Sequence, residues 1–292
     1  MTFVEVRKMT TKAFLVGIND YAPCGAGGPD LHGCVNDVKD MANTLVILGF
    51  SPKNIRILTD CAATKANILA GLSWLLGGVV KGDSIVFYYS GHGSQIVDTG
   101  GDEIDKKDEI ICPHDINFAN KVYISDDDFR AIFSKLPAGV NLEVILDSCF
   151  SGTGTREAIA LGDLPEECQT RVRYLEPPID QTFHIDYTPE LTTTGLLKGG
   201  NKTQKDMVIV PGLNHVLWGA CRDNQTSTET NLGGVPRGAF TYNFCLILRR
   251  TVGKMSRRDI DRLLTAALKK GGFAQVPQLE ASSPEMLQKP FK

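Results

Sequence analysis

The first half of the chain alternates short apolar runs with segments whose apolar residues recur at helical spacing. The runs at 12–18, 54–58, 84–89 and 142–146 are predicted as strands. Helices are predicted at about 36–48, after a cap at Thr64, and at 126–136 after a cap at Ser125. Strands that alternate with helices form a mainly parallel sheet with helices on both faces. The chain is therefore predicted to be an α/β protein.

The second half contains a segment of a different kind at 153–206, with little periodicity and several Pro, Thr and Gly residues. We interpret it as a mobile insert within one domain that spans 1–292, with 1–11 as an N-terminal extension. A strand at 215–221, helices at 239–250 and 256–270, and a strand near 275–279 bring the sheet to about six strands. The insert carries six basic residues, namely Arg156, Arg171, Arg173, Lys198, Lys202 and Lys205.

Composition excludes several classes of protein. The net charge is −3, which gives no reason to expect nucleic acid or an anionic membrane as a partner. The sequence has no apolar run long enough to span a bilayer and no recognisable signal peptide. The eight cysteines include no CxxC pair, so a zinc site is not expected. Free thiols in a reducing cytosol, and hence a cytoplasmic location, are predicted.

Two polar loops follow neighbouring strands and carry a candidate catalytic pair. The strand at 84–89 runs into Ser90-Gly91-His92-Gly93, and the strand at 142–146 runs into Asp147-Ser148-Cys149. The carboxyl ends of parallel strands open on one edge of a sheet, so His92 could deprotonate the Cys149 thiol for attack on a carbonyl carbon. The amides of Gly93 and Cys149 are candidates for an oxyanion hole. Taken alone, such a Cys is usually a small buried hydrophobe and such a His a loop residue.

The two loops together are more specific, since caspases place the His about 50 residues upstream of the Cys. The motifs at 89–93 and 147–152 resemble the signature motifs of metacaspases, and the resemblance extends over 12–154 and 217–244, including 223–227 and 238–241. It implies a caspase–hemoglobinase fold and a cysteine endopeptidase that cleaves after Arg or Lys and not after Asp. The catalytic pattern starts by residue 12, so a minimal form without a prodomain is expected.

Two carboxylates are candidates for the pocket that binds a basic side chain, because carboxylates recognise Arg through bidentate hydrogen bonds. Asp147 lies beside Cys149, and Asp37 follows the first strand. The alternative for Asp37 is that it merely caps its helix. The resemblance implies that both aspartates line the pocket, with Ser90 beside the catalytic His and Cys34 nearby. We expect Cys34 to be a wall residue rather than a second nucleophile.

Between residues 98 and 128 the sequence has ten carboxylates and three lysines. Clustered oxygen ligands suit Ca²⁺, although the spacing is not that of an EF-hand and a solvated acidic loop is the commoner case. The resemblance implies that Asp108, Asp126 and Asp127 bind Ca²⁺. A further acidic ligand expected after the Cys motif is replaced by Arg156, with Glu157 adjacent, so the site could be weakened or lost.

Three other functions fit the sequence less well. A caspase-like pseudoenzyme used as a scaffold is disfavoured by the intact His92 and Cys149, and a legumain-like or separase-like peptidase fits the aspartates and acidic loop less well. A nucleotide-binding protein is excluded because 19–33 contains no phosphate-binding loop. The metacaspase interpretation predicts a monomer that cuts itself in the insert after Arg or Lys, giving fragments of about 18 and 13 kDa.

Overall fold

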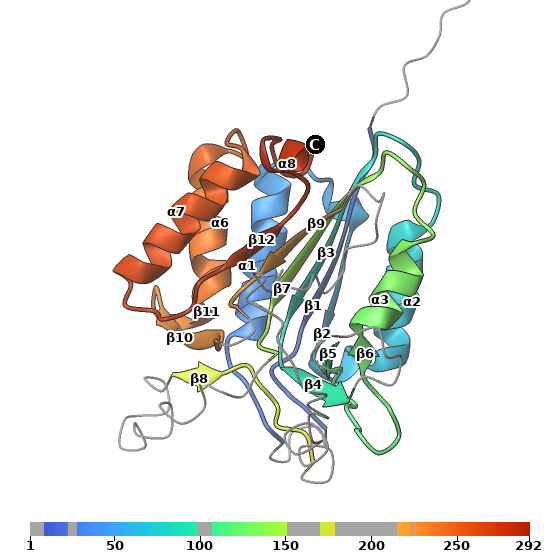
Figure 1. Cartoon of the computed structure of the whole chain (residues 1–292), viewed down its shortest axis with the longest axis vertical. Coiled ribbons are helices and arrows are strands. Elements are labelled where there is room, and N and C mark those ends of the chain that lie inside the picture. Colours follow the sequence, from blue (N-terminus) through green and yellow to red (C-terminus); the bar gives the residue numbers. More distant parts are fainter. Residues whose placement is uncertain (1–8, 23–27, 98–106, 151–169, 179–214, 223–224) are drawn as a thin grey trace, which may run out of the picture.

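A six-stranded sheet forms the centre of the protein, in the order β12-β9-β7-β3-β1-β2 (Figure 1). The computed structural model describes residues 9–22, 28–97, 107–150, 170–178, 215–222 and 225–292. The strands are β1 (Thr11–Gly17), β2 (Ile55–Thr59), β3 (Ser84–Ser90), β7 (Asn141–Asp147), β9 (His215–Gly219) and β12 (Gln278–Glu280). All neighbours pair in parallel except β12, which is antiparallel to β9. The predicted six-stranded, mainly parallel α/β fold is therefore confirmed.

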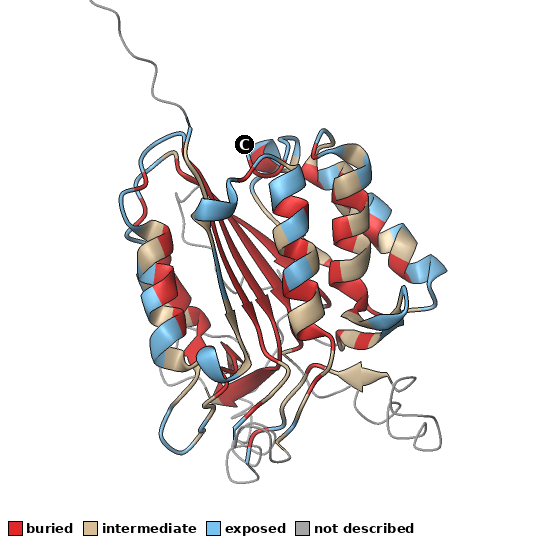
Figure 2. Ribbon diagram, turned by 180° about the vertical axis from the view of Figure 1, so that it is seen from behind, coloured by how far each residue is buried: buried red, intermediate tan, exposed pale blue. Residues whose placement is uncertain are grey.

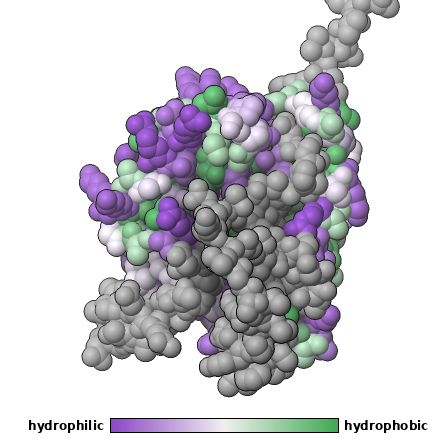
Figure 3. All heavy atoms as spheres, in the orientation of Figure 1, coloured by the Kyte–Doolittle hydropathy of each residue, from purple (hydrophilic) through white to green (hydrophobic). Residues whose placement is uncertain are grey.

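Helices cover both faces of this sheet. One face carries α1 (Cys34–Ile47), α6 (Ala239–Thr251) and α7 (Arg257–Lys270), and the other carries α2 (Lys65–Leu76) and α3 (Asp126–Phe133) (Figure 1). The short α8 (Ser283–Met286) and the turns η1 (Pro52–Asn54) and η2 (Asp60–Ala62) are the other helical elements of the described residues. The surface over α6 and α7 is mostly hydrophilic (Figure 3).

The central strands are buried along their whole length because both of their faces meet helices (Figure 2). In β3, Phe87 faces the α2 and α3 side, whereas its neighbours Val86 and Tyr88 face the side of α1 and α6. Such strands read as continuous apolar runs in the sequence, which is why they could be predicted. Their rigidity fixes the loops that follow β3 and β7.

Helix starts illustrate what local sequence can and cannot predict. Thr64 and Ser125 cap α2 and α3 through their side chains, as the sequence predicts. In contrast, α1 begins two residues before the predicted start and has no side-chain cap from Gly33. Its first amide, Cys34 N, donates instead to Asn19 Oδ1 at 2.8 Å. A cap supplied from another loop leaves no local signature, so the start was predicted late.

Two small sheets were not predicted. One contains β4 (Gly93–Val97), β5 (Lys107–Ile111) and β6 (Ile124–Ser125). The other contains β8 (Arg171–Val172), β10 (Thr228–Leu232) and β11 (Val235–Gly238). β10 and β11 form a hairpin whose turn, Gly233-Gly234, has φ values of +66° and +90°. This turn needs positive φ at both residues, which glycine adopts without strain.

A buried ion pair fastens the C-terminal part of the chain to β7. Arg257, at the start of α7, is fully buried and pairs with Glu143 in the middle of β7. Glu143 also accepts hydrogen bonds from Trp218 Nε1 at 2.8 Å and from Phe291 N at 3.2 Å. One carboxylate therefore joins β7 to β9, to α7 and to the last residues of the chain.

No helix in the described part of the chain is long and apolar enough to cross a membrane. Five of the described cysteines have free thiols, namely Cys34, Cys112, Cys149, Cys221 and Cys245. Cys61 is disulfide-bonded, so the expectation that all thiols are free is wrong at that position.

Candidate active site

The two motif loops meet at the carboxyl end of the sheet. β3 and β7 pair in parallel with Ser90 opposite Asp147, and Gly91 N donates to Asp147 O at 3.3 Å. The loops that carry His92 and Cys149 therefore start from adjacent, buried strand ends. The parallel topology positions both residues at the edge where α/β proteins place their chemistry.

Cys149 is fully buried, and its thiol is held by the backbone just before β10. Sγ donates to Ser227 O at 3.2 Å and accepts a short hydrogen bond from Ser227 N. A backbone N–H that points at sulfur favours a developing negative charge there. Among the described residues, the hydrogen bonds of this sulfur go to Ser227 rather than to the imidazole.

One ring nitrogen of His92 makes a hydrogen bond, and the other makes none in the described structure. Nε2 lies 2.6 Å from Pro29 O, and a carbonyl can only accept, so Nε2 carries the ring proton. Nδ1 therefore has the lone pair, and in the described structure it is buried without a hydrogen-bond partner. Burial lowers the pKa of His92 to about 4, since the charged imidazolium is poorly solvated there. The imidazole is therefore neutral at pH 7, and its Nδ1 lone pair is unoccupied and can accept a proton.

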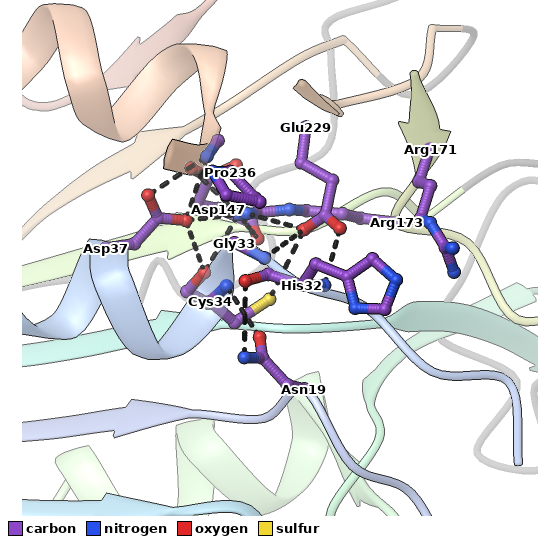
Figure 4. Close-up of polar contacts among 12 residues, drawn as sticks. Asn19, His32, Gly33, Cys34, Asp37, Asp147, Arg171, Arg173, Glu229 and Pro236 are labelled. Carbon is purple, nitrogen blue, oxygen red and sulfur yellow. Dashed lines mark hydrogen bonds and ion pairs between the residues drawn. The ribbon is translucent and has the colours of Figure 1, made fainter. Parts of the chain in front are cut away.

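A third residue, Arg173, lies buried at the same edge with its guanidinium among three carboxylates (Figure 4). Nη2 is 2.6 Å from Asp37 Oδ2 and 3.3 Å from Glu229 Oε2, and Nη1 is 3.0 Å from Asp147 Oδ2. Nη1 also donates to Ser90 Oγ at 2.8 Å and to Asp147 O at 3.1 Å. We call Asp37, Asp147 and Glu229 the acidic cluster.

Each member of the acidic cluster is fixed by groups other than Arg173. Asp37, in the first turn of α1, accepts from Gly238 N at 2.9 Å and from Ser90 Oγ at 3.0 Å. Asp147 accepts from Ser227 Oγ at 2.7 Å and from Thr241 Oγ1 at 2.6 Å. The cluster is thus preorganised by hydrogen bonds, so it does not depend on Arg173 for its shape.

Glu229 binds the backbone at the start of α1. Its Oε1 accepts from His32 N at 2.7 Å and its Oε2 from Gly33 N at 3.0 Å (Figure 4). Cys34 Sγ lies 3.9 Å from the same Oε2, and burial raises the pKa of this thiol well above its ordinary value. Cys34 is therefore a neutral thiol in the wall beside the cluster.

Three carboxylates around one guanidinium would leave a buried excess of negative charge. Burial raises the pKa of Asp37 to about 7, although the nearby Arg173 opposes the rise. Burial disfavours the charge of Arg173, but the surrounding acidic groups outweigh it and raise the pKa of its guanidinium. The arrangement therefore holds a cation firmly, and the pKa of about 7 means that the Asp37 carboxyl changes charge near neutral pH.

The backbone of Arg173 occupies the predicted oxyanion hole. Its carbonyl oxygen accepts from Gly93 N at 3.0 Å and from Cys149 N at 3.2 Å. On the N-terminal side, β8 pairs with β10, and Arg173 N donates to Ser227 O at 3.1 Å. On the C-terminal side, Leu175 N donates to Gly93 O at 2.9 Å. An extended segment thus crosses the site with one carbonyl on the two amides beside the thiol.

Comparisons with known proteins show which family the chain belongs to. Residues 11–156 match the model of the metacaspase, peptidase C14 domain. The chain is 32% identical to Metacaspase-1 of Scheffersomyces stipitis, over 94% of this chain and 71% of that protein. This chain belongs to the metacaspase family. It is also 31% identical to Metacaspase-1A of Aspergillus fumigatus, over 94% of this chain and 69% of that protein. It is a cysteine-type peptidase, and its substrates are proteins or peptides.

Solved structures show the same fold. A crystal structure of a protein from Geobacter sulfurreducens is 25% identical, covers 97% of this metacaspase and 98% of that chain, and has a TM-score of 0.64. Caspase-1 from Spodoptera frugiperda superposes with a TM-score of 0.55 at 11% identity, over 94% of this chain and 87% of that chain. The caspase-like fold expected from the motifs is confirmed.

The calcium candidates lie on β5 and α3, elements that contribute no residue to the acidic cluster. Asp108 is in β5, and Asp126 and Asp127 start α3, where both pair with Arg130. Among the described residues, no group of three or more His, Cys, Asp or Glu side chains is placed to hold a metal ion. Arg156 lies outside the described ranges, and so do the four acidic residues of the stretch that precede Asp108, namely Asp98, Asp102, Glu103 and Asp105.

Sequence reasoning missed two residues of this metacaspase site. Glu229 lies two residues beyond the recognised segment 223–227, and only its hairpin brings it to α1. The Gly-Gly turn of that hairpin was the available signal. Arg173 was noticed as one of six basic residues in the insert, but no local pattern separates it from the others.

Proposed function

We propose that this metacaspase is an endopeptidase that cleaves after Arg or Lys, with Cys149 as nucleophile and His92 as base. The observation that supports it most strongly is Arg173, whose side chain is bound by the acidic cluster while its carbonyl lies on the Gly93 and Cys149 amides. P1 denotes the residue that precedes the cleaved bond. Arg173 stands where a P1 residue would stand.

The chemistry follows from the groups present. His92 Nδ1 takes the Sγ proton, and the sulfur attacks the P1 carbonyl carbon to form a thioester. The two amides stabilise the negative charge that develops on the carbonyl oxygen. The imidazolium then protonates the leaving amine, and water, deprotonated by the same imidazole, hydrolyses the thioester.

Fluorogenic peptides with Arg, Lys or Asp at P1 test this proposal. We expect turnover with Arg and Lys and none with Asp, and Cys149→Ala and His92→Ala should each remove activity while keeping the wild-type thermal transition. Efficient cleavage after Asp, or activity that survives Cys149→Ala, would contradict the assignment. A chain that folds but cleaves no peptide would favour the alternative of a scaffold.

Self-processing and calcium stimulation belong to the same proposal. The basic residues of the insert match the specificity that the acidic cluster supports, so the chain is a substrate for itself. Asp108, Asp126 and Asp127 would contribute oxygen ligands to Ca²⁺ if Arg130 released the two aspartates and other ligands joined them. Activity titrated with Ca²⁺ and then with excess chelator tests this part. Full activity in chelator would refute it.

We also propose a cytoplasmic monomer. The edge strand β12 has three residues and offers little backbone for pairing with a second copy. Light scattering at working concentration tests the monomer, and a mass of twice 31.8 kDa would contradict it.

A further inference from the structure

We propose that the peptide bond between Arg173 and Tyr174 is the bond this metacaspase cuts in itself, and that residues 171–175 block the active site until it is cut. The inference rests on the proposed function, since it names a substrate of that same site. The proposal names one peptide bond of the chain as a site of proteolytic processing.

The segment binds on both sides of this bond. Before it, β8 adds to β10, with Val172 opposite Thr228 and Arg171 opposite Glu229. After it, Leu175 N donates to Gly93 O at 2.9 Å, and Ser94 Oγ donates to Leu175 O at 2.6 Å. An extended backbone held on both sides of a carbonyl that lies in an oxyanion hole is the geometry of a bound peptide substrate.

The structure distinguishes Arg173 from its basic neighbour. Arg173 is fully buried in the acidic cluster, whereas Arg171 is partly exposed and donates from Nη1 to Asp30 O at 3.0 Å. Arg171 therefore lies two residues before the bond, outside the cluster. Arg171→Gln is a matched control, since it removes the same charge two residues from Arg173 without touching the acidic cluster.

The reaction needs nothing beyond water. The Sγ proton goes to His92 Nδ1 as sulfur bonds to the Arg173 carbonyl carbon, and the bond to Tyr174 N breaks as that nitrogen takes the proton. Water then adds to the thioester, which leaves a carboxyl group on Arg173 and restores the thiol. Because the segment belongs to the same chain, its effective concentration at the thiol is high, and cutting proceeds within one molecule.

The uncut segment also excludes other substrates. A foreign peptide needs the acidic cluster, the two amides and the edge of β10, and residues 171–173 already use all three. Self-cutting makes Arg173 a chain end and removes the hold that Leu175 provides on the far side of the bond, so residues 171–173 are held on one side only and can leave the site. Activity on peptides should therefore follow the cut with a lag.

The experiment compares full-length wild type with Arg173→Gln, Arg171→Gln and Tyr174→Pro. Intact mass spectrometry of wild type should show fragments of about 19 and about 13 kDa, scaled by length from 31.8 kDa, the second starting at Tyr174. The rate should not depend on protein concentration. Arg171→Gln should be cut in the same way.

Arg173→Gln should stay uncut at this bond yet cleave an Arg peptide without a lag. Tyr174→Pro keeps Arg173 in the cluster but places an imino nitrogen at the bond, so it should be uncut and at least about tenfold less active than processed enzyme. A first fragment that starts elsewhere, or a Tyr174→Pro chain as active as processed wild type, overturns the inference. If either of these outcomes is found and the enzyme still cleaves Arg peptides, the proposed function stands and only this inference fails. If wild type and every variant fail to cleave Arg peptides, the proposed function itself is refuted.

Discussion

Glu229→Gln tests the member of the acidic cluster that the sequence motifs did not identify. The two terminal nitrogens of the Arg173 guanidinium contact different members of the acidic cluster. Asp147 and Ser90 gather around Nη1, with three acceptor atoms within 3.1 Å, whereas Asp37 and Glu229 share Nη2. A lysine ammonium has one nitrogen with three N–H groups, which matches the three acceptors around the Nη1 position. Lysine would therefore use the Asp147 side and leave Glu229 without a direct contact.

The expected magnitude follows from that contact. A hydrogen bond to a charged group contributes about 1.5–3 kcal/mol, and each 1.4 kcal/mol is a factor of ten. Glu229 Oε2 lies 3.3 Å from Nη2, so its loss should lower kcat/KM for a P1 Arg substrate by about 10- to 150-fold. For the matching Lys substrate we expect a change of less than about threefold.

The assay measures kcat/KM of processed wild type and Glu229→Gln on a pair of peptides that differ only in P1 Arg or Lys. The Lys peptide is the internal control, because Glu229 also binds the amides of His32 and Gly33, and damage there would lower both values equally. Equal losses on Arg and Lys would show that Glu229 supports the fold of the site and does not select the substrate.

Three further outcomes are expected. The KM for a P1 Arg peptide should fall as pH rises above about 7. With Arg173 bound the pKa of Asp37 is about 7, and an empty cluster lacks the cation that lowers this pKa, so it keeps the Asp37 proton to higher pH until a bound cation displaces it; a KM independent of pH from 7 to 9 contradicts this. Gly238→Ala should lower kcat/KM for Arg peptides about 100-fold, because the added Cβ would lie 2.3 Å from Asp147 Oδ2 and 2.7 Å from Arg173 Nη1. Near-wild-type kinetics of this variant would show that the acidic cluster can shift to make room. Asp127→Ala should raise the Ca²⁺ concentration for half-maximal activity about tenfold, and an unchanged titration curve excludes Asp127 as a ligand.

The sequence predicted those parts of the fold whose causes are local. The buried runs of β1, β3 and β7 and the caps at Thr64 and Ser125 were visible because each depends on residues close in the chain. The small sheet of β4, β5 and β6 was missed because its strands carry polar and acidic residues that resemble loop sequence. Side-chain periodicity predicts poorly where strands are short.

The candidate site divides in the same way. His92, Gly93, Asp147 and Cys149 follow strands that could be predicted, and the motif around them is long. The third carboxylate and the bound arginine come from segments far along the chain, and the pairing of β8 with β10 places both beside Asp37. Which of six basic residues meets three carboxylates depends on that tertiary pairing.

If the chain is cut after Arg173, the ion pair between Glu143 and Arg257 joins two separate polypeptides. Glu143 then belongs to one polypeptide, while Arg257, Trp218 and Phe291 belong to the other, and β7 and β9 become neighbours from different chains. Removing one partner of a buried pair costs about 3–5 kcal/mol, so this junction resists separation. The processed enzyme would be a heterodimer of its own halves, with an unfolding temperature that depends on concentration and an activity that declines on dilution near their dissociation constant.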